Sequence, residues 1–408
     1  MAAKKRPRHE SEDNSLSKRL KANKRSLRSL PDPKPIGALY WDINMMCHFR
    51  SIVHKIQPQG DKTQYREPST DDIELYNKMC WATQQFIDKA VQDCMNKTTD
   101  PSRIVLFIEE FGWKLFSICA HAESFRQICL VAKDREWWSL KNDISENKRS
   151  VEVYARSRQL EWRGPLLKHA QFDISGLREA LMPQIDIGSE HPHHLVQMAD
   201  GHLRRPHYKG IQQVNIGSNM LSEKFPKTEP NPLLRQEEWG ECDLCGSTKR
   251  CECRINSMSG DLLELVDYKD KGVGVRVLTD IKKGEILGEY AGIIQPPKQC
   301  DDEVYALTQE VHLPGEYTPV ARAYISSAWF GSWTRFINHS CNASTQFMYT
   351  LVGEQANTIV RATRDIAMFE ELTIDYGRGY WEARRGGCCC GSIKCRYPPN
   401  KQMGLARV

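Results

Sequence analysis

The cysteines constrain this chain more than any other residue type. Ten of the fifteen lie after residue 240, and eight of these ten fall in two closely spaced groups. The N-terminal sequence MAAKKRPRHESED has no apolar run after its charges, so we expect no secretory signal peptide and a reducing compartment. In such a compartment clustered cysteines are more often metal ligands than disulfides, so the C-terminal part is expected to fold around metal ions.

Both cysteine groups match the ligand spacing of zinc sites. The first supplies four thiolates within twelve residues, enough for one closed structural site. The second has the pattern C-x-C-x-x-x-x-C, which leaves the fourth tetrahedral position open, and the lone Cys341 in RFINHSC is the best candidate to fill it. Cys389 is expected to point away. The predicted zinc ligands are Cys242, Cys245, Cys251 and Cys253 in one site, and Cys341, Cys388, Cys390 and Cys395 in the other.

The length and the charge distribution of the chain limit how it can be divided into domains. A chain of 408 residues exceeds what one hydrophobic core holds, so more than one folded unit is expected. Residues 1–30 carry a net charge of +7, and the remaining 378 residues carry −2. We predict that residues 1–34 are a disordered basic tail, either a bipartite nuclear import signal or a solvated tail with weak nucleic-acid contact. We predict no membrane segment.

The middle of the chain has a pattern that predicts secondary structure, but it contains few residues that indicate a chemical function. From Ile73 to Cys94 apolar residues recur at helical spacing, and residues 102–141 are rich in helix formers. We predict a mainly helical domain of unknown role over residues 35–230.

After residue 256 the pattern changes to short segments rich in β-branched and aromatic residues. Examples are DLLELVDY, GVGVRVL, EILGEYAGII, STQFMYTLV and NTIVRAT, punctuated by Gly and Asp. This pattern is typical of short strands, so the C-terminal domain is predicted to be β-rich.

Four motifs occur in this region in a fixed order: KGVGVR from Lys271, GEYAG from Gly288, RFINHSC from Arg335, and ELTIDYG from Glu371. With the cysteine tail behind them, they strongly resemble the SET-domain protein-lysine methyltransferases, over about residues 256–397. The resemblance implies an α+β multidomain chain with a β-rich SET domain at 256–378, a knot-like crossing in it (the pseudoknot), and a post-SET zinc segment at 384–400. The cysteine knuckle at 238–255 takes the place of a pre-SET segment, with too few cysteines for a three-zinc cluster.

The resemblance also implies a cofactor, S-adenosylmethionine, and roles for individual residues. Tyr376, His339 and Asn338 are the candidate catalytic residues, and Tyr290 and Tyr324 are further candidates for the lysine channel. Ile374 occupies the position whose aromatic usually limits methylation, which suggests a di- or trimethyl product. The candidate cofactor-binding residues are Gly272, Val273, Gly274, Tyr324, Arg335, Phe336, Asn338, His339, Tyr376 and Trp381.

These features lead to one main hypothesis and two alternatives. The main hypothesis is a nuclear, chromatin-associated protein-lysine methyltransferase that acts on a histone tail, and the expected partner is a histone or other basic protein substrate. One alternative is a chromatin scaffold whose SET domain is weakly active or inactive, and the other is a methyltransferase of a non-histone protein. The target lysine and the oligomeric state are not encoded in any recognisable pattern.

Overall fold

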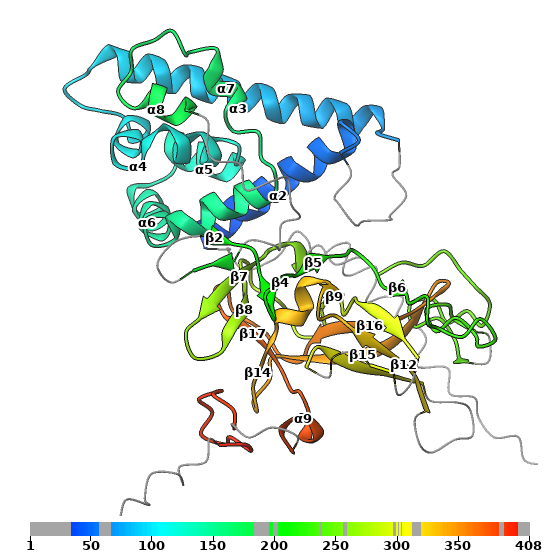
Figure 1. The fold of residues 1–408 in the computed structure, drawn as a ribbon. Coiled ribbons are helices and arrows are strands. Elements are labelled where there is room, and N and C mark those ends of the chain that lie inside the picture. Colours follow the sequence, from blue (N-terminus) through cyan, green and yellow to red (C-terminus); the bar gives the residue numbers. More distant parts are fainter. Residues whose placement is uncertain are drawn as a thin grey trace, which may run out of the picture.

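The computed structural model describes residues 34–56, 67–182, 196–198, 203–236, 239–255, 259–296, 299–300, 302, 304–311, 320–382 and 387–398 (Figure 1). The basic tail at 1–33 and its predicted import signal lie outside these residues. Among the described residues, no helix has the length and apolar character that crossing a membrane requires.

The first half of the described chain is helical. The helices are α2 (Pro35–Val53), α3 (Thr70–Asn96), α4 (Arg103–Ala120), α5 (Glu123–Leu130), α6 (Asp134–Ser157), α7 (Gly164–Leu167) and α8 (Leu177–Leu181).

Local sequence explains where these helices begin and which face they bury. At the start of α3, Ser69 accepts a hydrogen bond from the backbone N–H of Asp72, and the Asp72 carboxylate accepts one from the N–H of Ser69. This reciprocal capping satisfies two of the N–H groups that every helix start leaves unpaired. Ser102 caps α4 in the same position. The buried face of α3 includes Phe86 and Ile87, which confirms the helix expected from the spacing.

The second half is β-rich, as predicted, with only short helical turns. The strands are β1 (Val196–Gln197), β2 (Leu203–Arg204), β3 (His207–Tyr208), β4 (Ile211–Gln212), β5 (Val214–Asn215), β6 (Met220–Leu221), β7 (Leu263–Tyr268), β8 (Gly272–Val277), β9 (Ile286–Glu289), β10 (Ile293–Gln295), β11 (Ala306–Val311), β12 (Val320–Ser326), β13 (Phe330–Gly331), β14 (Asn338–His339), β15 (Thr345–Val352), β16 (Gln355–Ala362) and β17 (Glu371–Ile374). The short helices are η3 (Ser259–Asp261), η4 (Trp333–Phe336) and α9 (Arg378–Glu382).

These strands form several small sheets. The largest has the order β2-β1-β7-β8-β17-β15-β16-β9, with β14 pairing to β17, and a second has the order β11-β12-β10-β6. The strand β14, which carries Asn338 and His339, runs parallel to β17, so two motifs separated by about thirty residues lie side by side. The prediction of a mainly helical region followed by a β-rich region is confirmed.

The predicted helical domain over 35–230 is too long. Its helices end at Leu181, and residues 196–221 instead add strands to the C-terminal sheets: β1 pairs with β7, β5 with β13, and β6 with β10. Two-residue strands carry no periodicity, because only pairing with distant partners makes them strands. The β-rich body therefore begins well before residue 256.

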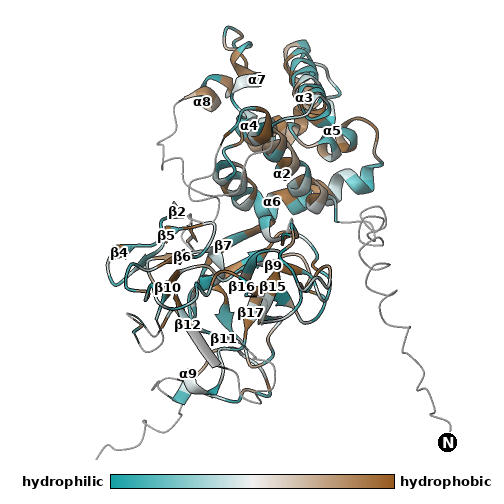
Figure 2. Ribbon diagram, turned by 90° about the vertical axis from the view of Figure 1, so that its right-hand side faces the viewer, coloured by the Kyte–Doolittle hydropathy of each residue, from teal (hydrophilic) through white to brown (hydrophobic). Residues whose placement is uncertain are grey.

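The helical region packs on one end of the β-rich body through α2 and α6 (Figures 1 and 2). Its hydrophobic core also includes Leu262, Leu278 and Met368 from the β-rich region. A buried polar chain crosses the same boundary: Tyr40 donates to Ser150 at 2.6 Å, and Ser150 donates to the carboxylate of Glu264 on β7 at 2.7 Å. The two regions thus share one buried interface.

Candidate active site

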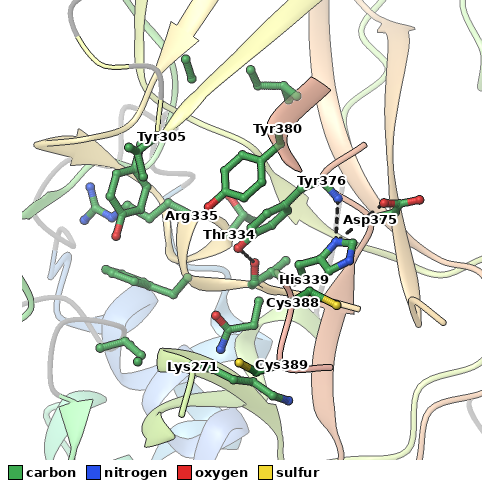
Figure 3. A pocket seen from close by; sticks show the side chains of 18 of the residues that line it. Lys271, Tyr305, Thr334, Arg335, His339, Asp375, Tyr376, Tyr380, Cys388 and Cys389 are labelled. Carbon is green, nitrogen blue, oxygen red and sulfur yellow. Dashed lines mark hydrogen bonds and ion pairs between the residues drawn. The ribbon is translucent and has the colours of Figure 1, made fainter. Parts of the chain in front are cut away.

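One cavity of about 630 Å³ collects most of the residues singled out from the motifs (Figure 3). It lies where the start of β8, the η4–β14 segment and the residues after β17 meet, with the C-terminal cysteine segment closing one side. Its volume is in the range that holds a cofactor-sized molecule. Of the predicted cofactor-binding and catalytic residues, those that line it are Gly272, Val273, Arg335, Phe336, Asn338, His339, Tyr376 and Trp381.

The two predicted cofactor glycines have different environments. Gly272 has φ +78° and lies at the cavity, and a Cβ there would meet nothing within 4 Å. Open space before a left-handed glycine lets a ligand approach the backbone closely. Gly274 does not line the cavity, and a Cβ there would lie 2.6 Å from Nδ2 of Asn338 and 2.8 Å from the ring of Tyr268. Gly274 therefore packs closely against Asn338 and Tyr268, where a larger residue would not fit.

The Asn338 side chain is fixed by an ionic network. Its Nδ2 donates to Glu371 at 3.0 Å, and the other Glu371 oxygen accepts from Lys271 Nζ at 2.7 Å. The three residues come from β14, from the start of β17 and from the residue before β8. The network therefore ties together the three segments that meet at the cavity, and Asn338 faces the cavity with a defined orientation.

His339 joins the cavity to the C-terminal cysteines (Figure 3). Its Nδ1 accepts a hydrogen bond from the backbone N–H of Tyr376 at 3.1 Å, and its Nε2 lies 3.4 Å from Sγ of Cys341. Burial lowers the pKa of His339 below its usual range, and Asp375 only partly opposes this shift. A neutral ring that accepts at Nδ1 carries its proton at Nε2, where it donates to the sulfur. His339 is thus held by both neighbours and acts as an organising residue.

Aromatic rings from the C-terminal motifs gather beside His339. The Tyr376 hydroxyl donates to the carbonyl of Ile337 at 2.8 Å, and its ring lies edge-on to Tyr380 at 4.6 Å. Trp381 lies edge-on to His339 at 4.8 Å, and its Nε1 is a buried donor with no partner among the described residues. Buried polar atoms normally have partners, so this N–H suits a ligand oxygen or nitrogen in the cavity.

Arg335 is a buried cation on the cavity wall. Its guanidinium donates to the carbonyls of Ser327 and Val214, each at 3.1 Å. Burial lowers its pKa to about 10, while the nearby Tyr305 and Tyr290 oppose the shift. Because Val214 belongs to β5, Arg335 ties the RFINHSC segment to the strands that precede the SET motifs.

Tyr324, one of the predicted cofactor-binding residues, does not line the cavity, whereas Tyr305 does. Tyr324 lies on β12 between Ala323 and Ile325, which are both buried in a hydrophobic cluster. Because strand side chains alternate between faces, Tyr324 points away from that cluster. Tyr305 was missed, since a single tyrosine before a strand carries no signal in one sequence. The channel candidate Tyr290 does line the cavity, and Phe347 and Leu307 are further lining residues that were not anticipated.

The C-terminal cysteines come together as the spacing predicted. The sulfur atoms of Cys341, Cys388, Cys390 and Cys395 all lie within 4.8 Å of one another and could hold a metal ion. Tetrahedral zinc with four thiolates places sulfur atoms about 3.8 Å apart, so the geometry fits. Burial opposes ionisation of Cys390, but backbone N–H groups at Cys341 and Ser392 outweigh it and lower its pKa to about 6. Cys389 is exposed and lies outside the group, on the cavity wall.

The four cysteines of the predicted knuckle also form one group within 4.8 Å. The knuckle is fastened to the β15–β16 hairpin. The Asp243 carboxylate accepts from Thr350 at 2.6 Å and from the N–H of Leu351 at 2.8 Å. The buried Arg235 donates to the carbonyls of Ser247 and Lys249. The knuckle is thus part of the body of the β-rich region.

Comparison with known proteins agrees with this geometry. Residues 272–377 match the family model of the SET domain. The chain therefore carries a SET domain, and the residues matched include most of the cavity wall described above.

Several curated proteins are similar to this region. A Nicotiana tabacum protein named histone-lysine N-methyltransferase, H3 lysine-9 specific SUVH1, is 34% identical over 37% of this chain and 24% of its own length. The Arabidopsis thaliana putative histone-lysine N-methyltransferase ASHH4 is 27% identical over 38% of this chain and 50% of its own length. The Caenorhabditis elegans probable histone-lysine N-methyltransferase set-23 is 26% identical over 43% of this chain and 96% of its own length. The chain thus spans half or less of the first two relatives.

A solved structure of KRYPTONITE with mCHH DNA, an H3(1-15) peptide and SAH overlaps 52% of this chain and 55% of that chain. The identity is 18% and the TM-score 0.34, values too low to support a conclusion about fold or function.

Proposed function

We propose that this protein is an S-adenosylmethionine-dependent protein-lysine N-methyltransferase that acts on a histone tail in the nucleus. One observation carries the proposal: Gly272, Asn338, His339 and Tyr376, which belong to three separate motifs, line a single cavity. The names of the curated relatives support the reaction class and a histone as substrate. The basic sequence of residues 1–30 supports the nuclear location.

The cavity residues fit S-adenosylmethionine. The open approach to Gly272 and the unpartnered N–H of Trp381 suit a polar cofactor, and the bound cofactor supplies a methyl group on a sulfonium. The two cysteine groups would hold zinc, and zinc in the C-terminal group would fix Cys388, which lines the cavity, and Cys341, whose sulfur contacts His339. No covalent chemistry is required of a side chain, so positioning supplies most of the rate.

The aromatic wall suits the aliphatic stem of a lysine. Tyr376, Tyr305, Tyr290 and Phe347 line the cavity, and such surroundings disfavour the charged ammonium, so the amine loses its proton more readily. The Tyr376 hydroxyl already donates to the carbonyl of Ile337, so its oxygen can accept from the amine and orient the nitrogen lone pair. A neutral amine oriented in this way would be able to accept the methyl group that the cofactor supplies.

We further propose a di- or trimethyl product. Ile374 is buried in the core beside Leu372 and is not one of the described residues that line the cavity. No aromatic ring from this position therefore narrows the space around the nitrogen. Mass spectrometry of a product that stops at one methyl group would contradict this part of the proposal.

The test is transfer of labelled methyl to core histones and nuclear extract by the full chain. We expect label on a histone band, and Tyr376→Phe should lower the rate roughly 100-fold, because a misplaced nitrogen loses the in-line geometry. The matched control is Tyr397→Phe, since Tyr397 stacks on Trp381 but does not line the cavity. Label on a non-histone band alone would indicate that the substrate is a protein other than a histone. No label from folded, cofactor-binding protein would favour a scaffolding role.

A further inference from the structure

The hairpin formed by β3 and β4 lies outside the matched SET segment, yet it adjoins the cavity. His207 from this hairpin, with Arg204 and Gln213 on either side of it, lines the cavity wall. We propose that the hairpin, acting through Asp302, is a positioning element that holds Tyr305 in the wall of the lysine channel. This inference rests on the proposed methyltransferase function and extends it to residues that precede the SET motifs.

Asp302 is the link between the hairpin and Tyr305. Its side chain is only 1% exposed, and it accepts four hydrogen bonds. Two come from the hairpin, from Tyr208 Oη and Lys209 Nζ, both at 2.8 Å. The other two come from the backbone N–H groups of Val304 at 2.9 Å and Tyr305 at 3.2 Å. One buried carboxylate therefore joins the hairpin to the backbone that carries the channel tyrosine.

The hairpin also contacts the Tyr305 ring directly. The ring of Tyr208 lies edge-on to that of Tyr305, with centroids 4.8 Å apart, and the Tyr208 ring also lies 6.3 Å from that of Trp329. The hairpin is well suited to hold this position. Its two-residue loop, Lys209 and Gly210, has φ of +50° and +80°, the turn geometry that matches the twist of paired strands.

The opposite side of Tyr305 is held by the SET core. Its carbonyl accepts from the Tyr290 hydroxyl at 2.9 Å and from the N–H of Ser327 at 3.0 Å. The core thus fixes the carbonyl, while the hairpin and Asp302 fix the N–H and one face of the ring. Without the hairpin, this segment would lose the ring contact with Tyr208, and Asp302 would lose the hydrogen bonds from Tyr208 and Lys209.

The charges of this network favour a fixed arrangement. Burial opposes ionisation of Asp302, but the hydrogen bonds from Lys209 and Tyr208 outweigh it and hold the Asp302 pKa below its usual value. An ionised, buried acceptor with four donors has a narrow choice of orientations, because each lost bond leaves a buried charge less satisfied. Substituting an amide removes the charge and turns one acceptor oxygen into a donor that faces Lys209 or the backbone N–H groups.

The experiment compares the steady-state kinetics of three variants of the full chain on a histone substrate. Asp302→Asn should lower kcat roughly tenfold or more, since small displacements at a reacting centre cost one to two orders of magnitude. Tyr208→Phe removes a single hydroxyl and should give a smaller loss in the same direction. Both should bind S-adenosylmethionine within about twofold of the wild-type affinity, because Asp302 and Tyr208 do not line the cavity themselves.

The matched control is Asp365→Asn. Asp365 also accepts from a backbone N–H, that of Lys283 at 2.8 Å, and from a lysine Nζ, but it lies on the surface away from the cavity. It should keep wild-type kinetics. Wild-type kcat and KM in folded Asp302→Asn and Tyr208→Phe would overturn the positioning role. If Asp302→Asn fails to fold, unchanged kinetics of Tyr208→Phe alone would overturn it. A wild-type protein with no transfer activity would instead overturn the proposed function, and this inference with it.

Discussion

Ser150 on helix α6 donates a hydrogen bond of 2.7 Å to the carboxylate of Glu264 on strand β7, and this bond joins the helical region to the SET body. Glu264 is 4% exposed and also pairs with Arg276 of β8. Because Arg276 lies on β8, which begins at the cavity residue Gly272, the contact with the helical region is connected through Glu264 to a strand that reaches the cavity wall. The helical region is therefore a structural support of the SET domain as well as a neighbour.

Removing the Ser150 hydroxyl should destabilise the whole chain. Ser150→Ala leaves the Tyr40 hydroxyl without its acceptor and removes one of the donors to the Glu264 carboxylate, which keeps Arg276, at a cost of about 1–3 kcal/mol in unfolding free energy. Urea denaturation measures the loss. The control is Ser145→Ala on the same helix, where the serine is exposed. Equal stabilities of the two variants would show that the buried hydrogen bonds contribute nothing.

Neighbouring cysteines in the C-terminal segment should differ in their effect on zinc content. Cys390→Ser removes a member of the four-sulfur group and should lower the zinc bound per chain from two ions to one. Cys389→Ser changes an exposed thiol outside the group and should leave two. Elemental analysis after gel filtration distinguishes them. Loss of zinc from Cys389→Ser, or two ions in Cys390→Ser, would contradict the ligand assignment.

Gly353 should be required for the knuckle to pack on the β15–β16 hairpin. It has φ +64°, and a Cβ would collide with the carbonyl of Cys253 and lie 3.1 Å from that of Cys251. Gly353→Ala should therefore cost roughly 3 kcal/mol or more and release zinc from the knuckle. Gly284→Ala is the control, because Gly284 also has positive φ, +91°, but a Cβ there meets nothing within 4 Å. A smaller loss in Gly353→Ala than in the control would disprove the steric argument.

Glu289 should make stability depend on pH. Burial raises its pKa from 4.5 to about 7, and a hydrogen bond from Asn219 only partly opposes the shift. Below pH 4.5 the group is protonated in both states and costs nothing. As the pH rises to about 7, the unfolded chain ionises it while the folded chain resists, so stability falls, by roughly 3 kcal/mol at most.

Glu289→Gln removes this titration and should be more stable than wild type at pH 8 but not at pH 4. Chemical denaturation at several pH values measures the difference. Glu354→Gln, at an exposed side chain, controls for the loss of a surface carboxylate. A stability difference between Glu289→Gln and wild type that stays constant from pH 4 to pH 8 would contradict the raised pKa.

Local patterns in the sequence predicted much of this protein. Helix α3 follows from the spacing of residues such as Phe86 and Ile87, and the strands β7, β8, β15 and β16 follow from their β-branched runs. Both cysteine groups follow from ligand spacing, since a tight turn brings nearby thiolates together whatever surrounds it. The motif order pointed to the cavity residues Asn338, His339 and Tyr376, because each motif is a contiguous string.

Tertiary structure alone decided what depends on contacts between distant segments. Strands β1, β5 and β6 form by pairing with the distant strands β7, β13 and β10, so no local periodicity in the sequence predicted them. Tyr305 lines the cavity because Asp302, Tyr208 and Tyr290 hold it there, whereas Tyr324, with an equally ordinary sequence context, faces elsewhere. The sequence determines the chemistry of each side chain. Which side chains share a cavity is determined by long-range packing, and a single sequence does not reveal it.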